Sequence, residues 1–591
     1  MNDSVGYVGM AECKTCHYDK HETFVHTGMG QSFSWATKIK SKGNFKNVSP
    51  IYDAKRNLYY LPKWKNEDLY ICEYRLANGD TIHYREEKIV YIIGSGQHTN
   101  SHFWKDGDFL YQAPLTFYTQ KGKWDLPPGF DLNNSSFERK IDVECMSCHN
   151  AIPNVDETSF NRFNSIPLGI DCERCHGPGE LHVKQKKQGI LVDTSKEADR
   201  SIVNPKRLPF QLQVDICQRC HLQGNNVLKP GKKFTDFRPG MKLSDVFEIY
   251  MPKYENNHKF VMAGHAERFQ KSQCFIHSNP NKTEVYNPKL NFTCINCHNP
   301  HVSVKSTGSD KFNLTCVNCH SENSTKSKLQ TCKLDKDKQI HANGCVGCHM
   351  PASGSEDIPH VTVHDHKIQR PSKNKQKEKG ALLGLYSINN AKTDKHTEIQ
   401  AYLSYFEKFE NNPLYLRKAN ELIEQTEKTD IEQEIYYAYL KKDFKGVVSK
   451  SQELKENSIN DAWTCYRIAK SLDATENLSA SIGWYKRAYT LKSNNLDYGV
   501  EYANALIRLK QITEAKDLLI KQLNIAKKHQ LTLLNLGVAY YLEQNMGLAK
   551  RYFQQVLNLN PDHKLANLYM SELYNKVGDV EKSKIYLKKS Q

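Results

Sequence analysis

The chain has 591 residues, enough for two to four domains, and a net charge of +16 at neutral pH. Hydrophobic residues make up only 39% of it, which is low for a globular chain, so part of the interior is expected to be filled by something other than aliphatic side chains. The sequence has no run of about 20 apolar residues and begins with a polar segment, so neither a transmembrane helix nor a signal peptide is expected in it.

The first motif in chain order is CKTCH at residues 13–17, in which a histidine directly follows two cysteines spaced two residues apart. The same C-x-x-C-H pattern recurs at residues 145–149, 172–176, 217–221, 294–298, 316–320 and 345–349. Its seven copies contain 14 of the 18 cysteines. All but one of the cysteines and 21 of the 24 histidines lie before residue 370, so the two ends of the chain are expected to perform different tasks.

This pattern is typical of c-type haem attachment, in which both thiols bond to the porphyrin and the histidine ligates the iron. One helical turn brings the three side chains to one face. A zinc site would pair two C-x-x-C half-sites without requiring a histidine in every copy. Disulfides are a further alternative in an exported protein, and they do not explain the histidines either. The sequence therefore predicts seven covalently bound c-type haems.

The predicted attachment residues are Cys13, Cys16, Cys145, Cys148, Cys172, Cys175, Cys217, Cys220, Cys294, Cys297, Cys316, Cys319, Cys345 and Cys348. The predicted proximal iron ligands are His17, His149, His176, His221, His298, His320 and His349. Seven haems would bring about 14 propionate charges, so the basic excess is interpreted as internal neutralisation by arginine and lysine. A nucleic-acid partner is therefore not expected.

Further histidines in the same part of the chain could supply distal ligands on the opposite side of each iron. His182 and His301 closely follow a proximal histidine, so neither can easily cross to the far face of its own haem. Each is expected to reach the iron of a neighbouring haem, which would hold haems in close pairs. The distal candidates are His26, His182, His301, His360 and His366, with one of His98 and His102 and one of His258 and His265.

Residues 55–93 alternate between apolar and polar side chains, and Asn78-Gly79 between two such runs is a strong hairpin signal. We expect a small antiparallel sheet at about residues 50–120, with Cys72 in its core. Cys274 and Cys332 are left over from the motifs, and the spacing cannot decide whether they form a disulfide. The basic segment at 370–380 is interpreted as part of a solvated linker.

From about residue 397 onward the pattern becomes helical and repeats with a period of 34 residues, the length of a tetratricopeptide repeat. The copy with the best match has the signature residues Leu533, Leu536, Gly537, Tyr540, Ala549, Phe553 and Pro561. Cys465 occupies a packing position in an earlier copy, and we expect five to six units in all. Stacked repeats form a curved superhelix that serves partner binding, self-association or bracing against the rest of the chain.

Several longer phrases carry a family resemblance: HTGMGQSF at 26–33, GSGQHTNSHF at 94–103, CHGPGELH at 175–182, CHNPH at 297–301 and CHMPASGSEDIPHVTVHDHKIQR at 348–370. The chain resembles multihaem c-type cytochromes fused to tetratricopeptide repeats, in the class of hydroxylamine oxidoreductase, its tetrahaem electron acceptor and pentahaem nitrite reductase. The resemblance implies electron transfer. Pentahaem nitrite reductase has lysine as the proximal ligand of its catalytic haem, whereas all seven motifs here end in histidine.

The expected fold is mainly α. A cofactor-packed heptahaem domain at 1–370 contains the small β insertion, a basic linker spans 371–396, and an α-α superhelix of tetratricopeptide repeats spans 397–591. The expected function is electron transfer along a haem chain, with redox proteins or a second copy as partners. The alternative is an oxidoreductase that acts on a small nitrogen or sulfur compound at one open haem. Because thioether haem is installed after export, a periplasmic or cell-surface location is expected.

Overall fold

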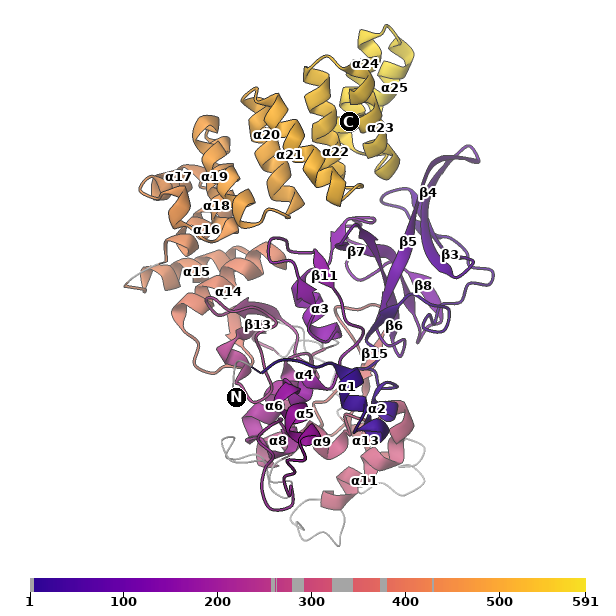
Figure 1. Cartoon of the computed structure of the whole chain (residues 1–591), viewed down its shortest axis with the longest axis vertical. Coiled ribbons are helices and arrows are strands. Elements are labelled where there is room, and N and C mark those ends of the chain that lie inside the picture. Colours follow the sequence, from indigo (N-terminus) through magenta and orange to yellow (C-terminus); the bar gives the residue numbers. More distant parts are fainter. Residues whose placement is uncertain are drawn as a thin grey trace.

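The computed structural model describes residues 5–256, 261, 263–278, 292–320, 344–371, 380–427 and 430–591. We call residues 5–371 the motif region and residues 395–590 the repeat region. In Figure 1 the short helices of the motif region lie at the bottom, its large sheet stands at one side, and the repeat region arches above both. Within the described residues, no helix is long and apolar enough to cross a membrane.

A nine-stranded antiparallel sheet is the largest element of the motif region. Its strands run in the order β2-β3-β4-β5-β6-β7-β8, with β1 on β5 and β9 on β7. The strands are β1 (Phe33–Trp35), β2 (Ile51–Asp53), β3 (Leu58–Lys65), β4 (Asp68–Ala77), β5 (Asp80–Ile93), β6 (Thr99–Asp106), β7 (Phe109–Tyr118), β8 (Lys123–Asp125) and β9 (Arg139–Lys140).

The hairpin predicted at Asn78-Gly79 is confirmed, because β4 and β5 pair up to Ala77 and Asp80 and both turn residues have positive φ. The predicted burial of Cys72 is also confirmed. The sheet is larger than expected, because short strands from outside 50–120 complete its edges. The prediction of a mainly α fold is therefore only partly correct.

Each C-x-x-C-H motif lies on a short helix or at its end, as the shared helical face of the three side chains requires. The helices that carry motifs are α1 (Met10–Lys14), α3 (Val143–His149), α4 (Glu173–His176), α6 (Phe210–Gln218), α9 (Cys294–Cys297), α11 (Ser309–His320) and α13 (Gly344–His349). Between them lie α2 (Tyr18–Phe24), α5 (Glu180–Lys187), α7 (His265–Gln270), α8 (Gln273–Ser278), α10 (Val304–Thr307) and the small sheets β10 (Asn154–Val155) with β11 (Phe163–Ser165) and β14 (Ala352–Gly354) with β15 (Thr362–His364).

A three-stranded sheet joins the motif region to the repeat region. It consists of β12 (Asn225–Leu228), β13 (Phe247–Tyr254) and β16 (Leu382–Ser387). The first repeat helix, α14 (Lys395–Lys408), packs its buried Ile399 and Tyr402 against Val227 and Tyr250 of this sheet. The prediction of a linker at 371–396 is therefore wrong at the residues of β16, which form a strand. Residues 372–379 lie outside the described residues. The two regions share a core.

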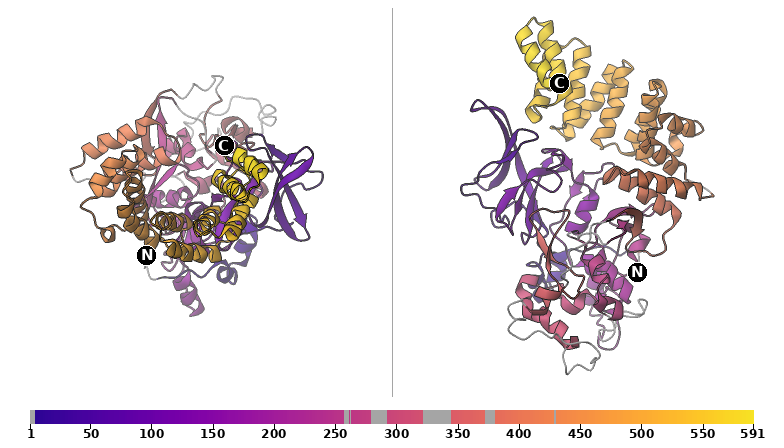
Figure 2. Two further views of the ribbon diagram at one scale, coloured as in Figure 1. Left: turned by 90° about the horizontal axis from the view of Figure 1, so that it is seen from above. Right: turned by 180° about the vertical axis from the view of Figure 1, so that it is seen from behind.

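In the described part of the repeat region, helices stack as six consecutive antiparallel pairs along a curved path, visible from above in Figure 2. The helices after α14 are α15 (Pro413–Glu424), α16 (Ile431–Leu440), α17 (Phe444–Ser451), α18 (Ala462–Ala474), α19 (Leu478–Leu491), α20 (Leu496–Arg508), α21 (Ile512–Ile525), α22 (Gln530–Leu542), α23 (Met546–Leu559), α24 (Lys564–Lys576) and α25 (Val580–Ser590). A Cβ on Gly537 would lie 2.5 Å from the Phe553 ring, so only glycine permits this approach of α22 and α23. Cys465 is fully buried in the repeat core, as predicted.

Three loops between successive repeats rest on the motif region. They are residues 492–495, 526–529 and 560–563, which begin 34 residues apart. In the first, the backbone N–H of Asn494 donates to the Thr158 carbonyl at 3.0 Å. In the second, two backbone N–H groups donate to Asp106, and in the third, Asp562 accepts hydrogen bonds from Nη1 and Nη2 of Arg75 at 2.7 and 2.6 Å. One edge of the superhelix is thus fixed on the motif region at the repeat period.

Candidate haem-binding site

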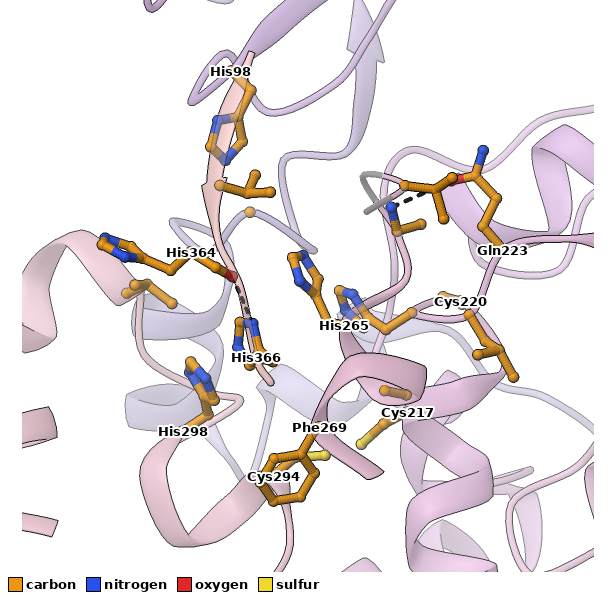
Figure 3. Close-up of a pocket in the computed structure, with 18 of the residues that line it drawn as sticks. His98, Cys217, Cys220, Gln223, His265, Phe269, Cys294, His298, His364 and His366 are labelled. Carbon is orange, nitrogen blue, oxygen red and sulfur yellow. Dashed lines mark hydrogen bonds between the residues drawn. The ribbon is translucent and has the colours of Figure 1, made fainter. Parts of the chain in front are cut away.

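A cavity of about 2870 Å³ runs through the motif region. Six of the seven motifs line it, while the first motif lies outside it and exposes Cys16 and His17. The repeat region contributes to the wall through Tyr405, Phe409 and Glu410 at the end of α14. The close-up in Figure 3 shows His98, His265, His298, His364 and His366 gathered in this cavity beside motif cysteines. The cavity is therefore shaped by the residues that the sequence assigned to haem.

Four proximal histidines each lie opposite a second histidine ring. The ring centres are 6.4 Å apart for His17 and His182, 6.0 Å for His176 and His301, 5.9 Å for His221 and His265, and 6.1 Å for His298 and His366. A bond from a metal to an imidazole nitrogen is about 2 Å long, and the ring centre lies about 1 Å farther on, so two imidazoles on one metal have centres about 6 Å apart. The four pairs have the spacing of ligands on opposite sides of one iron.

The hydrogen bonds of these rings leave the correct nitrogen available. Nδ1 of His176 donates to the Val203 carbonyl at 2.9 Å, and Nδ1 of His366 donates to the His364 carbonyl at 2.9 Å. Nδ1 of His349 makes the same type of bond to the Gln369 carbonyl at 3.0 Å. A ring that donates from Nδ1 presents the lone pair of Nε2, which is the usual arrangement of a metal-bound histidine. The donor set thus fits haem iron.

Burial favours the neutral form, which is the form that binds metal, in several of the cavity histidines. Burial lowers the pKa of His149, His221 and His298 below its ordinary value. Burial, followed by the neighbouring His366, lowers the pKa of His265 to about 2. The rings of His265 and His366 lie only 4.7 Å apart, so the second members of two ring pairs pack against each other.

Cysteines of different motifs lie close to one another. The neighbouring pairs are Cys13 with Cys172, Cys148 with Cys220, Cys217 with Cys294, and Cys316 with Cys345. The pair of His176 and His301 joins the third and fifth motifs, and helix α9 of the fifth motif packs against helix α11 of the sixth. All seven motifs therefore form one connected network. No disulfide joins any two of the described cysteines, and Cys332 lies outside the described residues.

The remaining distal candidates occupy different surroundings. His98 lines the cavity, whereas His102 is buried in β6, where Nδ1 donates to the Leu115 carbonyl at 3.0 Å. His360 lies off the cavity wall, with Nε2 2.9 Å from Asp125 and its ring against Tyr118. His26 is exposed and does not line the cavity, and His258 lies outside the described residues. Of the open choices, the structure brings His98 and His265 to the site.

Sequence reasoning missed His364, which lines the cavity and donates from Nδ1 to the Met350 carbonyl at 2.6 Å. The available signal was the spacing of two residues between His364 and His366 near the end of β15. The sequence also did not specify which basic residues would face the cofactors. The cavity-lining cations are the guanidinium groups of Arg139, Arg174, Arg219 and Arg370. Arginine suits paired hydrogen bonds to carboxylates.

Comparisons with known proteins match two parts of the chain. Residues 130–177, which contain the second and third motifs, match the family described as cytochrome c554 and c-prime. Residues 532–563 match a tetratricopeptide repeat. These findings support a cytochrome with a repeat domain and suggest covalently bound haem. No curated protein matches the chain.

Solved structures of MamA are similar to part of the chain. One, MamA from MSR-1, has 15% identity over 27% of this chain and 92% of its own, with a TM-score of 0.24. Another, from Desulfovibrio magneticus RS-1, has 14% identity over 34% of this chain and 95% of its own, with a TM-score of 0.23.

Proposed function

We propose that the chain is a seven-haem c-type cytochrome that transfers electrons along a connected row of haems. The observation that supports this most directly is the set of four histidine pairs at the spacing of two ligands on one iron. The cysteine pairs of the seven motifs would hold the porphyrins. Bound haem would supply reversible one-electron chemistry at its iron.

The residues of the chain would control that chemistry in three ways. Paired imidazoles would close both faces of an iron, which leaves no position for a substrate. Buried apolar walls such as those formed by Phe103, Ala266 and Phe269 would exclude water from the cavity. The cavity-lining arginines would neutralise propionates by charge-assisted hydrogen bonds.

The neighbour relations of the motifs indicate the order of transfer. The first motif would communicate with the third, the third with the fifth, and the fifth with the fourth and sixth. The second motif would join through the fourth, and the seventh through the sixth. The exposed first motif would then be a point of exchange with a redox partner outside the cavity.

The second candidate function is an oxidoreductase for a small nitrogen or sulfur compound. The observation that favours it is the lack of a second imidazole at the 6 Å spacing opposite His149 among the described residues, an absence that His349 shares. Arg139, Gln112 and Gln97 line the same cavity and could orient a polar ligand there. Such an activity requires an iron with one open axial position.

The deciding experiment combines a haem count with electron paramagnetic resonance of the exported protein. A pyridine haemochrome should give seven haems per chain, and a redox titration should be reversible. His301→Ala should keep the count at seven and convert one low-spin signal to high spin, whereas His396→Ala in the repeat region should change neither. Fewer haems, or no effect of His301→Ala, would contradict the proposal. A high-spin signal in the unaltered protein would favour the second candidate.

We place the mature protein in the periplasm or on the cell surface, because thioether haem is attached after export. The repeat region would bind a redox partner or a second copy through surfaces other than its fixed edge. Tetratricopeptide repeats commonly mediate such contacts.

A further inference from the structure

The ring pair of the exposed first motif has a charged group behind it. His182, on α5, faces His17 at 6.4 Å between ring centres. Its Nδ1 lies 2.9 Å from Ser201 Oγ. Ser201 Oγ in turn lies 2.5 Å from Asp199 Oδ1, and Asp199 Oδ2 lies 3.5 Å from the same Nδ1.

The direction of these bonds follows from the donors. With Nε2 as the ligand of the iron, Nδ1 of His182 carries the proton and donates to the Ser201 hydroxyl. That hydroxyl then donates to the Asp199 carboxylate, which can only accept. A carboxylate at the end of this chain pulls the Nδ1 proton outward and makes the imidazole a stronger electron donor at Nε2.

Other candidate ligand histidines have a neutral partner at the same position. Nδ1 of His176, His349 and His366 donates to a backbone carbonyl. A carbonyl bears only a partial charge, so it polarises the ring less than a carboxylate does. The Asp199 side chain is only 11% exposed, so solvent screens its charge incompletely.

We propose that Asp199, acting through Ser201, is a positioning residue that lowers the reduction potential of the haem held between His17 and His182. This inference rests on the proposed function, because it assumes that His182 ligates that iron. A stronger donor and a nearby negative charge both favour the more positive, oxidised iron. Lys186, whose Nζ lies 2.8 Å from Asp199 Oδ2, offsets part of this effect and holds the carboxylate in place.

The chain contains a matched control six residues earlier. Asp193 Oδ1 lies 3.0 Å from Ser195 N and 2.6 Å from Ser195 Oγ, as Asp199 Oδ1 lies 2.9 and 2.5 Å from the same atoms of Ser201. The control pair makes the same turn, and its side-chain hydrogen bonds involve no histidine of the described chain. Substitutions there change the same local hydrogen bonds without touching His182.

The test is a spectroelectrochemical titration of the full-length holoprotein carrying Ser201→Ala or Asp199→Asn. Ser201→Ala keeps the net charge, so it separates the hydrogen bond from a simple charge effect. We expect one of the seven transitions to move upward, with about a tenfold change in the ratio of oxidised to reduced haem at fixed potential, or about 59 mV for one electron. The low-spin resonance of the same haem should change its g values.

Ser201→Thr should restore the original midpoint, because it retains the hydroxyl. Ser195→Ala and Asp193→Asn should leave all midpoints unchanged. The inference is overturned if Ser201→Ala leaves every midpoint in place, or if the control variants produce the same shift. A haem count below seven in the unaltered protein, or an unchanged spectrum for His182→Ala, would instead contradict the proposed function.

Discussion

Asp106→Ala tests whether the repeat region is held on the sheet through its inter-repeat loops. Asp106 is buried at the end of β6, and its carboxylate accepts the backbone N–H groups of Lys527 at 2.9 Å and Lys528 at 2.7 Å. Hydrogen bonds to a charged group contribute about 1.5–3 kcal/mol each. Burial raises the pKa of Asp106, so keeping its carboxylate charged offsets part of the stabilisation by these hydrogen bonds. We therefore expect a net loss of about 2–3 kcal/mol in the free energy of local opening.

Hydrogen exchange of the loop at 526–529 measures this loss directly. A loss of 2–3 kcal/mol corresponds to exchange of the Lys527 and Lys528 amides that is about 30- to 160-fold faster. The control is Asp108→Ala, because Asp108 is on the same hairpin but half-exposed, and its two ion pairs with Lys105 and Arg162 are both 3.5 Å long. Unchanged exchange in Asp106→Ala, or an equal change in the control, would refute the bracing of this loop.

Three further outcomes are expected. Glu173→Ala removes the acceptor of three backbone N–H groups and should free the N-terminal segment for limited proteolysis, at a cost of about 2–4 kcal/mol. Cys465→Ser places a hydroxyl in an apolar core and should lower the free energy of unfolding of the repeats by about 1–3 kcal/mol, seen as a lower urea midpoint. A serine substitution at the surface should leave the midpoint unchanged. Burial would raise the pKa of Asp394, but hydrogen bonds from Lys229 outweigh it and lower this pKa to about 2. The stability contributed by the Asp394 carboxylate is therefore complete above about pH 4 and is lost as the pH falls toward 2. Unfolding curves of Asp394→Asn should approach those of the unaltered protein in that range.

The sequence predicted those features whose chemistry is local. Each C-x-x-C-H motif states its attachment residues and proximal ligand within five residues, and Asn78-Gly79 specifies a turn without reference to the rest of the chain. The period of 34 residues similarly indicates paired helices from the spacing of small and large side chains alone. These signals depend on neighbours along the backbone, which a single sequence displays.

Contacts between distant segments were not predictable in the same way. That His182 faces His17 and that His301 faces His176 depends on how the short motif helices pack, which periodicity does not encode. His360 and His366 have similar sequence surroundings, but only His366 lies in the cavity, because Asp125 and Tyr118 of the sheet hold His360 elsewhere. The extent of the sheet was missed since β1 and β9 are too short to show alternation.

Successive repeat loops are attached to the nine-stranded sheet, and this attachment constrains how many repeats the protein can gain or lose. A free-standing solenoid can gain or lose a unit, since each unit contacts only its neighbours. Here, one unit inserted between α20 and α22 would carry Asp562 away from Arg75 and leave the anchoring carboxylate of Asp106 facing a different loop. The width of the sheet thus fixes how many units span it, and variation in unit number is confined to the end beyond the last anchored loop.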